Sequence, residues 1–235
     1  MAKHPLWSDE YWLLLMQIYL RKPVGVKPLY SKQVVGLALE LHIPPQFLYE
    51  QMFRLRALDT PQIEKLWERY GKSPRRLARG VQLLRQMKGF GQASDFYDGV
   101  TIQESFERDF KPIEVDGSWM KTDLTAVKAG EAKESDCLMP IHLVMVLDLY
   151  FRLTPSTMVK ETPEVVELSR LMSVPTGTIV DVMEVFRVCD PYLKNDDFII
   201  HPLLDSCFST WRKYADDKPE RLASLAAQLK NYFKE

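Results

Sequence analysis

The chain is poor in the residues on which metal centres, disulfide frameworks and thiol chemistry depend. Its three cysteines are an odd number and form no Cys-x-x-Cys pair, so their spacing excludes a zinc knuckle and predicts reduced, buried thiols. Its four histidines form no His-x-x-x-His or Glu-x-x-His pattern, and we therefore expect no metal site. The sequence implies no cofactor.

Long apolar runs are also missing. No run approaches the roughly 20 residues that a helix needs to span a bilayer, and residues 1–5 lack the apolar stretch of a secretion signal. We expect a cytoplasmic protein without a membrane partner. With 10 glycines and a hydrophobic content of 46%, the composition is that of an ordinary globular chain and not of a disordered one.

An internal repeat organises the chain. Residues 12–60 and 143–191 align without a gap at an offset of 131 residues. The pairs expected in the two cores are Tyr19 and Tyr150, Leu37 and Leu168, Met52 and Met183, and, after a change of offset, Trp67 and Trp211. Such a repeat indicates a tandem duplication.

Both halves show the apolar spacing of consecutive helices. Four residues stand where helix N-caps are expected: Ser8, Ser31, Thr60 and Ser73. Prolines mark the helix breaks, most clearly at Pro44-Pro45. In the first half we expect helices over residues 8–21, 31–42, 45–58, 61–70 and 74–87.

The predicted fold class is all-α, with two tandem duplicated helical bundles. We assign residues 1–92 to the first helical unit, residues 93–137 to an acidic connector and residues 138–235 to the second unit. The connector lacks long helical periodicity and reads as partly irregular, with turns near Gly99 and Gly117.

Each unit contains a pair of helices with helix-turn-helix spacing. In the first unit the small residue is Ala38, the turn residue is His42 and the aliphatic residue after the turn is Ile43. In the second unit the same positions are taken by Ser169, Ser173 and Val174. A small residue lets two helices approach and the aliphatic residue fills their crossing. A helical hairpin without a DNA role produces a similar spacing, so both interpretations stay open.

Charge is distributed unevenly. Residues 1–92 hold 15 Lys and Arg against 7 Asp and Glu, residues 93–137 hold 5 against 11, and residues 138–235 hold 11 against 14. A basic cluster is the electrostatic footprint of a polyanion partner. An ordinary solvated surface is the alternative explanation.

The candidate DNA-binding residues all lie in the first unit. On the third helix, Gln46 and Arg54 are candidates for contacts to the edges of the DNA bases. The basic residues expected to contact phosphates are Lys72, Arg75, Arg76 and Arg79. The second unit carries Asp181 and Glu184 on its third helix, where they would repel phosphates. The alternative is that the arginines pair with Glu64, Glu68 and the acidic connector, through Asp95, Asp98, Glu104 and Glu107.

Three segments of the second unit, 142–152, 162–171 and 182–191, resemble a helical module that precedes HNH nuclease domains in some bacterial restriction endonucleases. The first unit matches through Tyr19, residues 39–41 and residues 55–59. The resemblance implies a helical fold that helps to position DNA. No HNH-like cluster of metal ligands and base follows, so the nuclease part is absent from the sequence given.

No catalytic residue is predicted, because no local Ser-His-Asp or Cys-His arrangement occurs. We therefore expect a protein that is not an enzyme and that binds the DNA phosphate backbone through its basic first unit. The alternative is a protein-interaction scaffold of two helical repeats without nucleic-acid affinity, whose partner binds the second unit or the connector. The sequence carries no signal for an oligomeric state.

Overall fold

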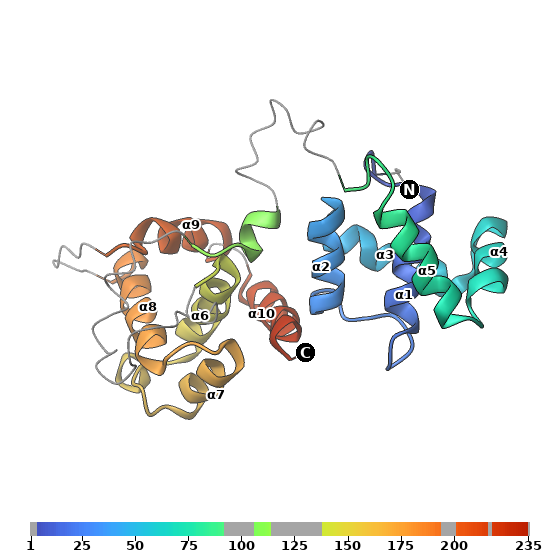
Figure 1. Ribbon diagram of the computed structural model, residues 1–235. Helices are drawn as coiled ribbons and strands as arrows, with labels where there is room; N and C mark the ends of the chain where they lie inside the picture. The colour runs from blue at the N-terminus through green and yellow to red at the C-terminus, as the bar shows by residue number, and fades with distance from the viewer. Residues whose placement is uncertain (1–3, 92–105, 114–137, 194–200, 216–217, 235) are drawn as a thin grey trace, which may run out of the picture. The chain divides into compact units, whose positions relative to one another are not determined.

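The computed structural model describes residues 4–91, 106–113, 138–193, 201–215 and 218–234. Within these ranges every regular element is a helix, which confirms the all-α class (Figure 1). The chain divides into two compact units, Met1–Glu107 and Arg108–Lys234. Their boundary falls inside the predicted connector, of which the structure describes only residues 106–113. No helix in these ranges has the length and apolarity that crossing a membrane requires.

The first unit begins with a short 3-10 turn and continues with five α-helices. These are η1 (Asp9–Tyr11), α1 (Trp12–Leu20), α2 (Lys32–Leu41), α3 (Pro45–Ala57), α4 (Pro61–Tyr70) and α5 (Pro74–Arg85). Another 3-10 turn, η4 (Phe106–Phe110), follows in the chain. The described helices of the second unit are α6 (Pro140–Arg152), η7 (Pro155–Thr157), α7 (Pro163–Met172), α8 (Thr176–Cys189), α9 (Leu204–Tyr214) and α10 (Pro219–Phe233).

Three of the four predicted caps are confirmed. The hydroxyl of Ser8 accepts from Glu10 N–H, that of Ser31 from Val34 N–H and that of Thr60 from Ile63 N–H. The fourth prediction holds for the position alone. Ser73 precedes α5 as expected, but its side chain makes no capping hydrogen bond. The backbone N–H groups that follow Pro74 in the first turn of α5 therefore receive no hydrogen bond acceptor from Ser73.

Helix α1 forms the centre of the first unit and packs against α2, α3 and α5. Its buried side chains fall on more than one face, as the sequence predicted. The core around it is fully closed: Leu15, Val34, Leu48 and Met52 are each 0% exposed. Burial of an aliphatic side chain of this size contributes about 1.5–3 kcal/mol, so this packing fixes where α2, α3 and α5 lie.

The second unit repeats this plan around α6, which packs against α7, α8, α9 and α10. Every residue from Ile141 to Tyr150 is buried. Two of the four expected core pairs, Leu37 with Leu168 and Met52 with Met183, are buried in both units, but Tyr19 and Trp67 are only half-buried. The reason is that α4 packs mainly on α5, whereas its counterpart α9 packs on both α6 and α8.

The offset of 131 residues also relates the helix bounds. Helix α2 spans Lys32–Leu41 and α7 spans Pro163–Met172, so both their first and their last residues differ by 131 positions. Helix α3 begins at Pro45 and α8 at Thr176, again 131 positions apart. The duplication itself stays a hypothesis. It predicts matching helix bounds of this kind.

Candidate nucleic-acid interface

The turn between α2 and α3 is built as the sequence predicted. His42 ends α2 in the left-handed conformation, with φ 55° and ψ 36°. Ala38 and Ile43 are both 0% exposed, and the Ala38 carbonyl accepts a hydrogen bond from Ile43 N–H at 3.1 Å. Ser173, at the equivalent position of the second unit, has φ 56° and ψ 37°. The geometry is that of two helices around a tight turn, and a DNA-reading role for the pair stays a prediction.

Polar and apolar side chains share the exposed face of α3, which carries Gln46, Glu50, Phe53, Arg56 and Ala57. Leu48, Met52 and Leu55 point into the core. On the opposite side Phe53 is 44% exposed, and its ring meets the Tyr49 ring edge-on at 5.0 Å. An aromatic pair in this position suits an apolar partner better than the hydrogen-bonding edges of a major groove.

The two predicted base-reading residues both make contacts within the first unit. Gln46 is exposed, but its side-chain amide donates to the Tyr30 hydroxyl at 2.8 Å. Arg54 donates through Nε to Asp59 Oδ2 at 2.6 Å and through Nη1 to Gln51 Oε1 at 3.0 Å. Its guanidinium also lies over the Trp12 ring, 5.7 Å from the centroid. Arg54 therefore stabilises the end of α3 and is not free to reach a ligand without losing these contacts.

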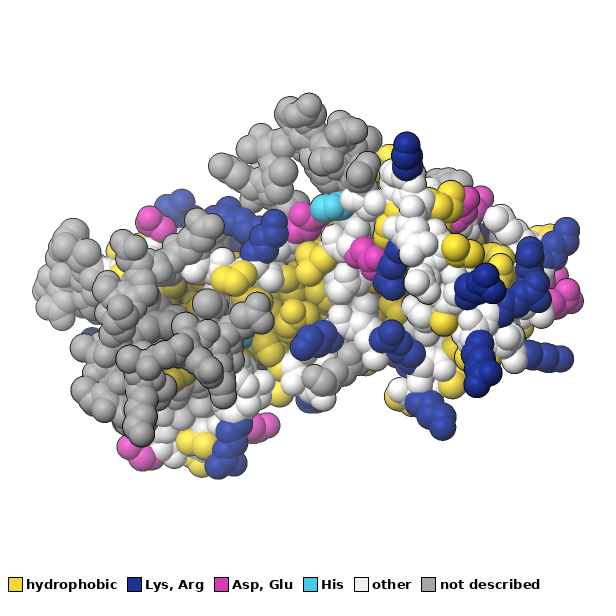
Figure 2. Space-filling model, viewed as in Figure 1, with side chains coloured by type: hydrophobic (Ala, Val, Ile, Leu, Met, Phe, Trp, Pro, Cys, Tyr) yellow, Lys and Arg dark blue, Asp and Glu magenta, His cyan; other side chains and the backbone are white. Residues whose placement is uncertain are grey.

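The four predicted phosphate-contacting residues form a different set. Lys72, Arg75, Arg76 and Arg79 are all exposed, and we call them the α5 basic surface. Arg76 stacks over the Tyr70 ring at 5.7 Å. Within the described part of the chain none of the four makes an ion pair. Figure 2 shows dark-blue Lys and Arg side chains gathered over the part of the first unit that carries α4 and α5.

The orientation of α5 explains why these side chains point outward. Its buried face consists of Leu77, Val81 and Leu84, which pack toward α1. Arg75 and Arg79 are one helical turn apart and lie on the face opposite to these residues. The local sequence thus places both guanidinium groups in solvent.

Two more bases belong to this region and were missed by the sequence interpretation. Lys65 and Arg69 are exposed on α4, four residues apart. The helical spacing of Lys65 and Arg69 continues toward Lys72. This periodicity in the sequence could have identified them as part of the basic surface. From residue 61 to residue 88 the chain holds eight Lys and Arg against two Asp and Glu, so the excess of positive charge is local and large.

The competing salt-bridge interpretation holds at other positions. Arg85 pairs with Glu40 through two hydrogen bonds, of 2.6 and 2.8 Å, and this pairing raises the pKa of the guanidinium. Glu107, an expected neutraliser of the arginines, instead accepts from His42 Nδ1 at 2.6 Å. Glu64 and Glu68 make no ion pair with the α5 basic surface among the described residues. The other expected neutralisers, Asp95, Asp98 and Glu104, lie outside the described residues.

The second unit lacks the basic surface. Counting from Pro74 in α5 and Pro219 in α10, the positions of Arg75 and Arg79 are taken by Glu220 and Ser224, both exposed. On α8, Glu184 pairs with Arg187 at 3.1 Å. The positive potential is therefore a property of the first unit.

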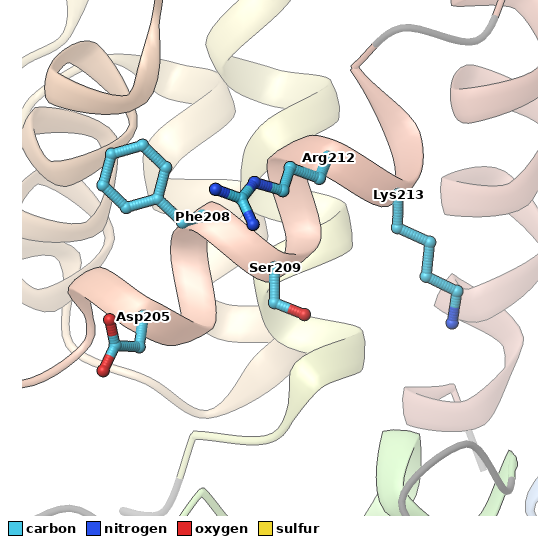
Figure 3. A pocket seen from close by; sticks show the side chains of 5 residues that line it. All are labelled: Asp205, Phe208, Ser209, Arg212 and Lys213. Carbon is cyan, nitrogen blue, oxygen red and sulfur yellow. The ribbon is translucent and has the colours of Figure 1, made fainter.

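The second unit has a cavity with a volume of about 460 Å³. Its lining side chains, among them Asp205, Ser209 and Lys213, all project from α9 (Figure 3). Lys213 lies 3.6 Å from Asp109, and no hydrogen bond joins Asp205 to Ser209 in the described structure. The lining residues thus provide no nucleophile–base contact. In the described ranges, no group of three His, Cys, Asp or Glu side chains is placed to hold a metal ion.

Comparison with known proteins adds no assignment to this geometry. The chain matches no protein-family model, and neither a curated protein nor a solved structure matches it significantly.

Proposed function

We propose that the first unit binds the phosphate backbone of duplex DNA through the α5 basic surface. The observation that carries the proposal is the exposure of Lys72, Arg75, Arg76 and Arg79 without an acidic partner among the described residues. In a chain of net charge −1, four such bases on one short stretch attract a polyanion. The protein acts in this proposal as a binding factor and not as an enzyme.

The N-terminus of α5 strengthens the attraction. The helix dipole places about half a positive charge there, and the uncapped N–H groups after Ser73 can donate to phosphate oxygens. Arg75 and Arg76 lie in this first turn, where a cation is disfavoured by about 0.3–1 kcal/mol each. A bound phosphate would offset this cost. Phosphate binding would therefore explain why two arginines stand at an electrostatically unfavourable position.

The geometry argues for contacts to phosphates and against direct reading of bases. Gln46 and Arg54 are held by contacts within the first unit, and base readout would require both to break them. Phosphate contacts carry no sequence information. We therefore expect binding to be nearly independent of DNA sequence.

The test is the binding of a labelled random-sequence duplex, followed by fluorescence anisotropy between 50 and 200 mM salt. Four phosphate contacts predict a slope of log K against log salt of roughly −3.6. In the variant Arg75→Glu with Arg79→Glu the slope should become shallower, with a magnitude of about 1.8 or smaller. Arg76 is kept because its stacking on Tyr70 is part of the packing.

A matched control has the same change of net charge in the second unit. Arg170→Glu with Arg212→Glu alters two exposed residues, and this variant should bind DNA as the unchanged chain does. If no binding occurs at 50 mM salt, or if both double variants lose affinity equally, the proposal is wrong.

The exposed aromatic pair on α3 favours a second candidate function, a protein-interaction scaffold. Tyr49 on α3 is half-buried and Phe53 is exposed, and two further apolar side chains of the first unit are exposed: Leu83 on α5 and Met87 after it. A scaffold predicts no DNA affinity at low salt and a protein partner that is lost on Phe53→Ser. The anisotropy experiment therefore separates the two functions before any partner is known.

A further inference from the structure

A second candidate site lies elsewhere on the first unit, between α1, α2 and α5. The structure has a cavity there of about 160 Å³. Leu14, Ile18 and Leu37 form its apolar wall, and all three are buried. Arg21 and Lys32 line one end of it. Both bases are exposed, and neither side chain has an acidic partner among the described residues.

The other end of the cavity is closed by a neutralised pair. Glu40 and Arg85 also line it, and their two hydrogen bonds satisfy each other's charge. The net positive charge of the cavity therefore lies at the end formed by Arg21 and Lys32. Lys32 is the first residue of α2, where the helix dipole adds to the positive potential.

The second unit has a cavity at the corresponding place, between α6, α7 and α10, with a volume of about 40 Å³. Six residues of the first lining have a counterpart in the second under the 131-residue offset, whereas Leu14, Gln17, Lys32 and Arg85 have none at that offset. The corresponding pairs are Ile18 and Leu149, Arg21 and Arg152, Gln33 and Glu164, Gly36 and Glu167, Leu37 and Leu168, and Glu40 and Leu171.

Two of the differences between the linings bear on the size and the charge of the cavities. Where the second unit has Glu167, the first has Gly36, and a Cβ atom added to Gly36 would meet nothing within 4 Å. Where Arg152 is paired with Asp148 at 2.9 Å, Arg21 faces Gln17, which carries no charge. The first cavity is the larger, at about 160 Å³ against about 40 Å³. Arg21 has no acidic partner among the described residues, whereas Arg152 is paired with Asp148.

We propose that the cavity of the first unit binds a small carboxylate with a short apolar chain. Arg21 offers a planar fork of donors that matches a carboxylate, and Lys32 adds a point charge. The chain of the ligand would pack over Gly36 against Ile18 and Leu37. A volume of about 160 Å³ has room for about five water-sized groups, which fits butyrate. This inference does not depend on DNA binding.

The test uses the full chain labelled with ¹⁵N and titrated with butyrate, inorganic phosphate and n-butylammonium. A six-atom ligand is expected to bind with a Kd of about 1–10 mM. Butyrate should give saturable shifts at Lys32, Gly36 and Leu37. Butylammonium, which has the apolar chain and the opposite charge, should give none. Phosphate should bind more weakly, because it makes no use of the apolar wall.

Two variants at one position separate filling of the cavity from damage to the helix. Gly36→Glu copies the second unit and should weaken butyrate binding at least tenfold. Gly36→Ala adds a single methyl group in open space and should retain binding. Unchanged affinity in Gly36→Glu, or shifts that are equal for butyrate and butylammonium, would overturn the proposal.

The charge is tested separately. Arg21→Gln with Lys32→Gln should abolish the saturable shifts, whereas Lys22→Gln, an exposed neighbour that does not line the cavity, should leave them unchanged. Equal effects of the two variants, or phosphate binding as tight as that of butyrate, would show that the cavity does not select an apolar carboxylate.

Discussion

His142 makes the stability of the second unit depend on pH in a direction that the structure fixes. Its ring is 2% exposed and stacks on Phe233 with the centroids 5.0 Å apart. Nδ1 accepts a hydrogen bond from Met139 N–H at 2.9 Å, so the proton of the neutral ring is on Nε2, which has no hydrogen-bond partner in the described structure. Burial lowers the pKa of this histidine from 6.5 to about 4.

The size of the effect follows from the difference in pKa. Between pH 6.5 and pH 4 the unfolded chain binds a proton at His142 and the folded chain does not. The free energy of unfolding therefore falls as the pH falls through this window and is fully retained above pH 6.5. At about 1.4 kcal/mol for each unit of pKa, the total loss from this residue is about 3 kcal/mol.

Urea unfolding followed by circular dichroism at pH 7.5, 6.5, 5.0 and 4.0 measures this loss. The comparison is with His142→Asn, whose side-chain oxygen can accept from Met139 N–H but does not titrate. Burial also lowers the pKa of His4 and of His201, and both are unchanged in the variant. The stability difference between the two proteins should change by about 3 kcal/mol from pH 6.5 to pH 4. A difference that stays constant within 1 kcal/mol across that range would refute the reasoning.

Three further predictions concern packing and reactivity. Gly80→Ala should raise the free energy of unfolding by about 0.5–1 kcal/mol, measured by urea denaturation, because the new methyl group meets its nearest neighbour at an ordinary 3.5 Å. Phe186→Ala should lower it by about 3–5 kcal/mol, since that side chain is 0% exposed. In a Cys137→Ser chain the two remaining thiols should resist a disulfide reagent until urea is added. Burial raises the pKa of Cys189 to about 11 and raises that of Cys207 as well.

The helix boundaries were predictable because their causes are local. Ser31 and Thr60 cap the helices that follow them, and Pro44-Pro45 separates α2 from α3 where the sequence indicated. The apolar spacing also placed the buried faces correctly. Ser73 occupies the predicted N-cap position but makes no capping hydrogen bond, since a serine before a proline satisfies the sequence pattern whether or not its hydroxyl turns toward the helix.

The contacts of individual polar side chains were not predictable, because their partners come from other elements. Arg54 has the spacing of a groove-facing residue, yet Trp12 on α1 and Asp59 after α3 hold it. The pairing of Arg85 with Glu40 joins α5 to α2 across 45 residues. The residue pattern of one helix does not indicate contacts with a distant helix. The sequence therefore identified the basic residues but could not distinguish those that form ion pairs from those that do not.

The cavity of the first unit was missed for a related reason. Gly36 reads in the sequence only as a weak point in a helix, at a cost of about 1 kcal/mol relative to alanine. The role of Gly36 in the cavity depends on Arg21 and Ile18, which come from another part of the chain. It becomes visible only in comparison with Glu167, the larger residue at the corresponding position of the second unit. Only the comparison of two folded units shows that the glycine leaves space.

The comparison between units also indicates where a function would lie. Under the duplication hypothesis, corresponding positions inside both cores carry residues of one kind, as in Met52 and Met183, both 0% exposed. Some substitutions that change charge fall on the surface: two exposed arginines of α5 correspond to Glu220 and Ser224. If these substitutions were neutral drift, gains of positive charge would be expected about equally in both units. Instead the unpaired bases gather in the first, around two separate features, the α5 basic surface and the cavity that Gly36 leaves open. The first unit is therefore the one in which binding should be sought, and the second unit supplies the reference against which each of its residues can be tested.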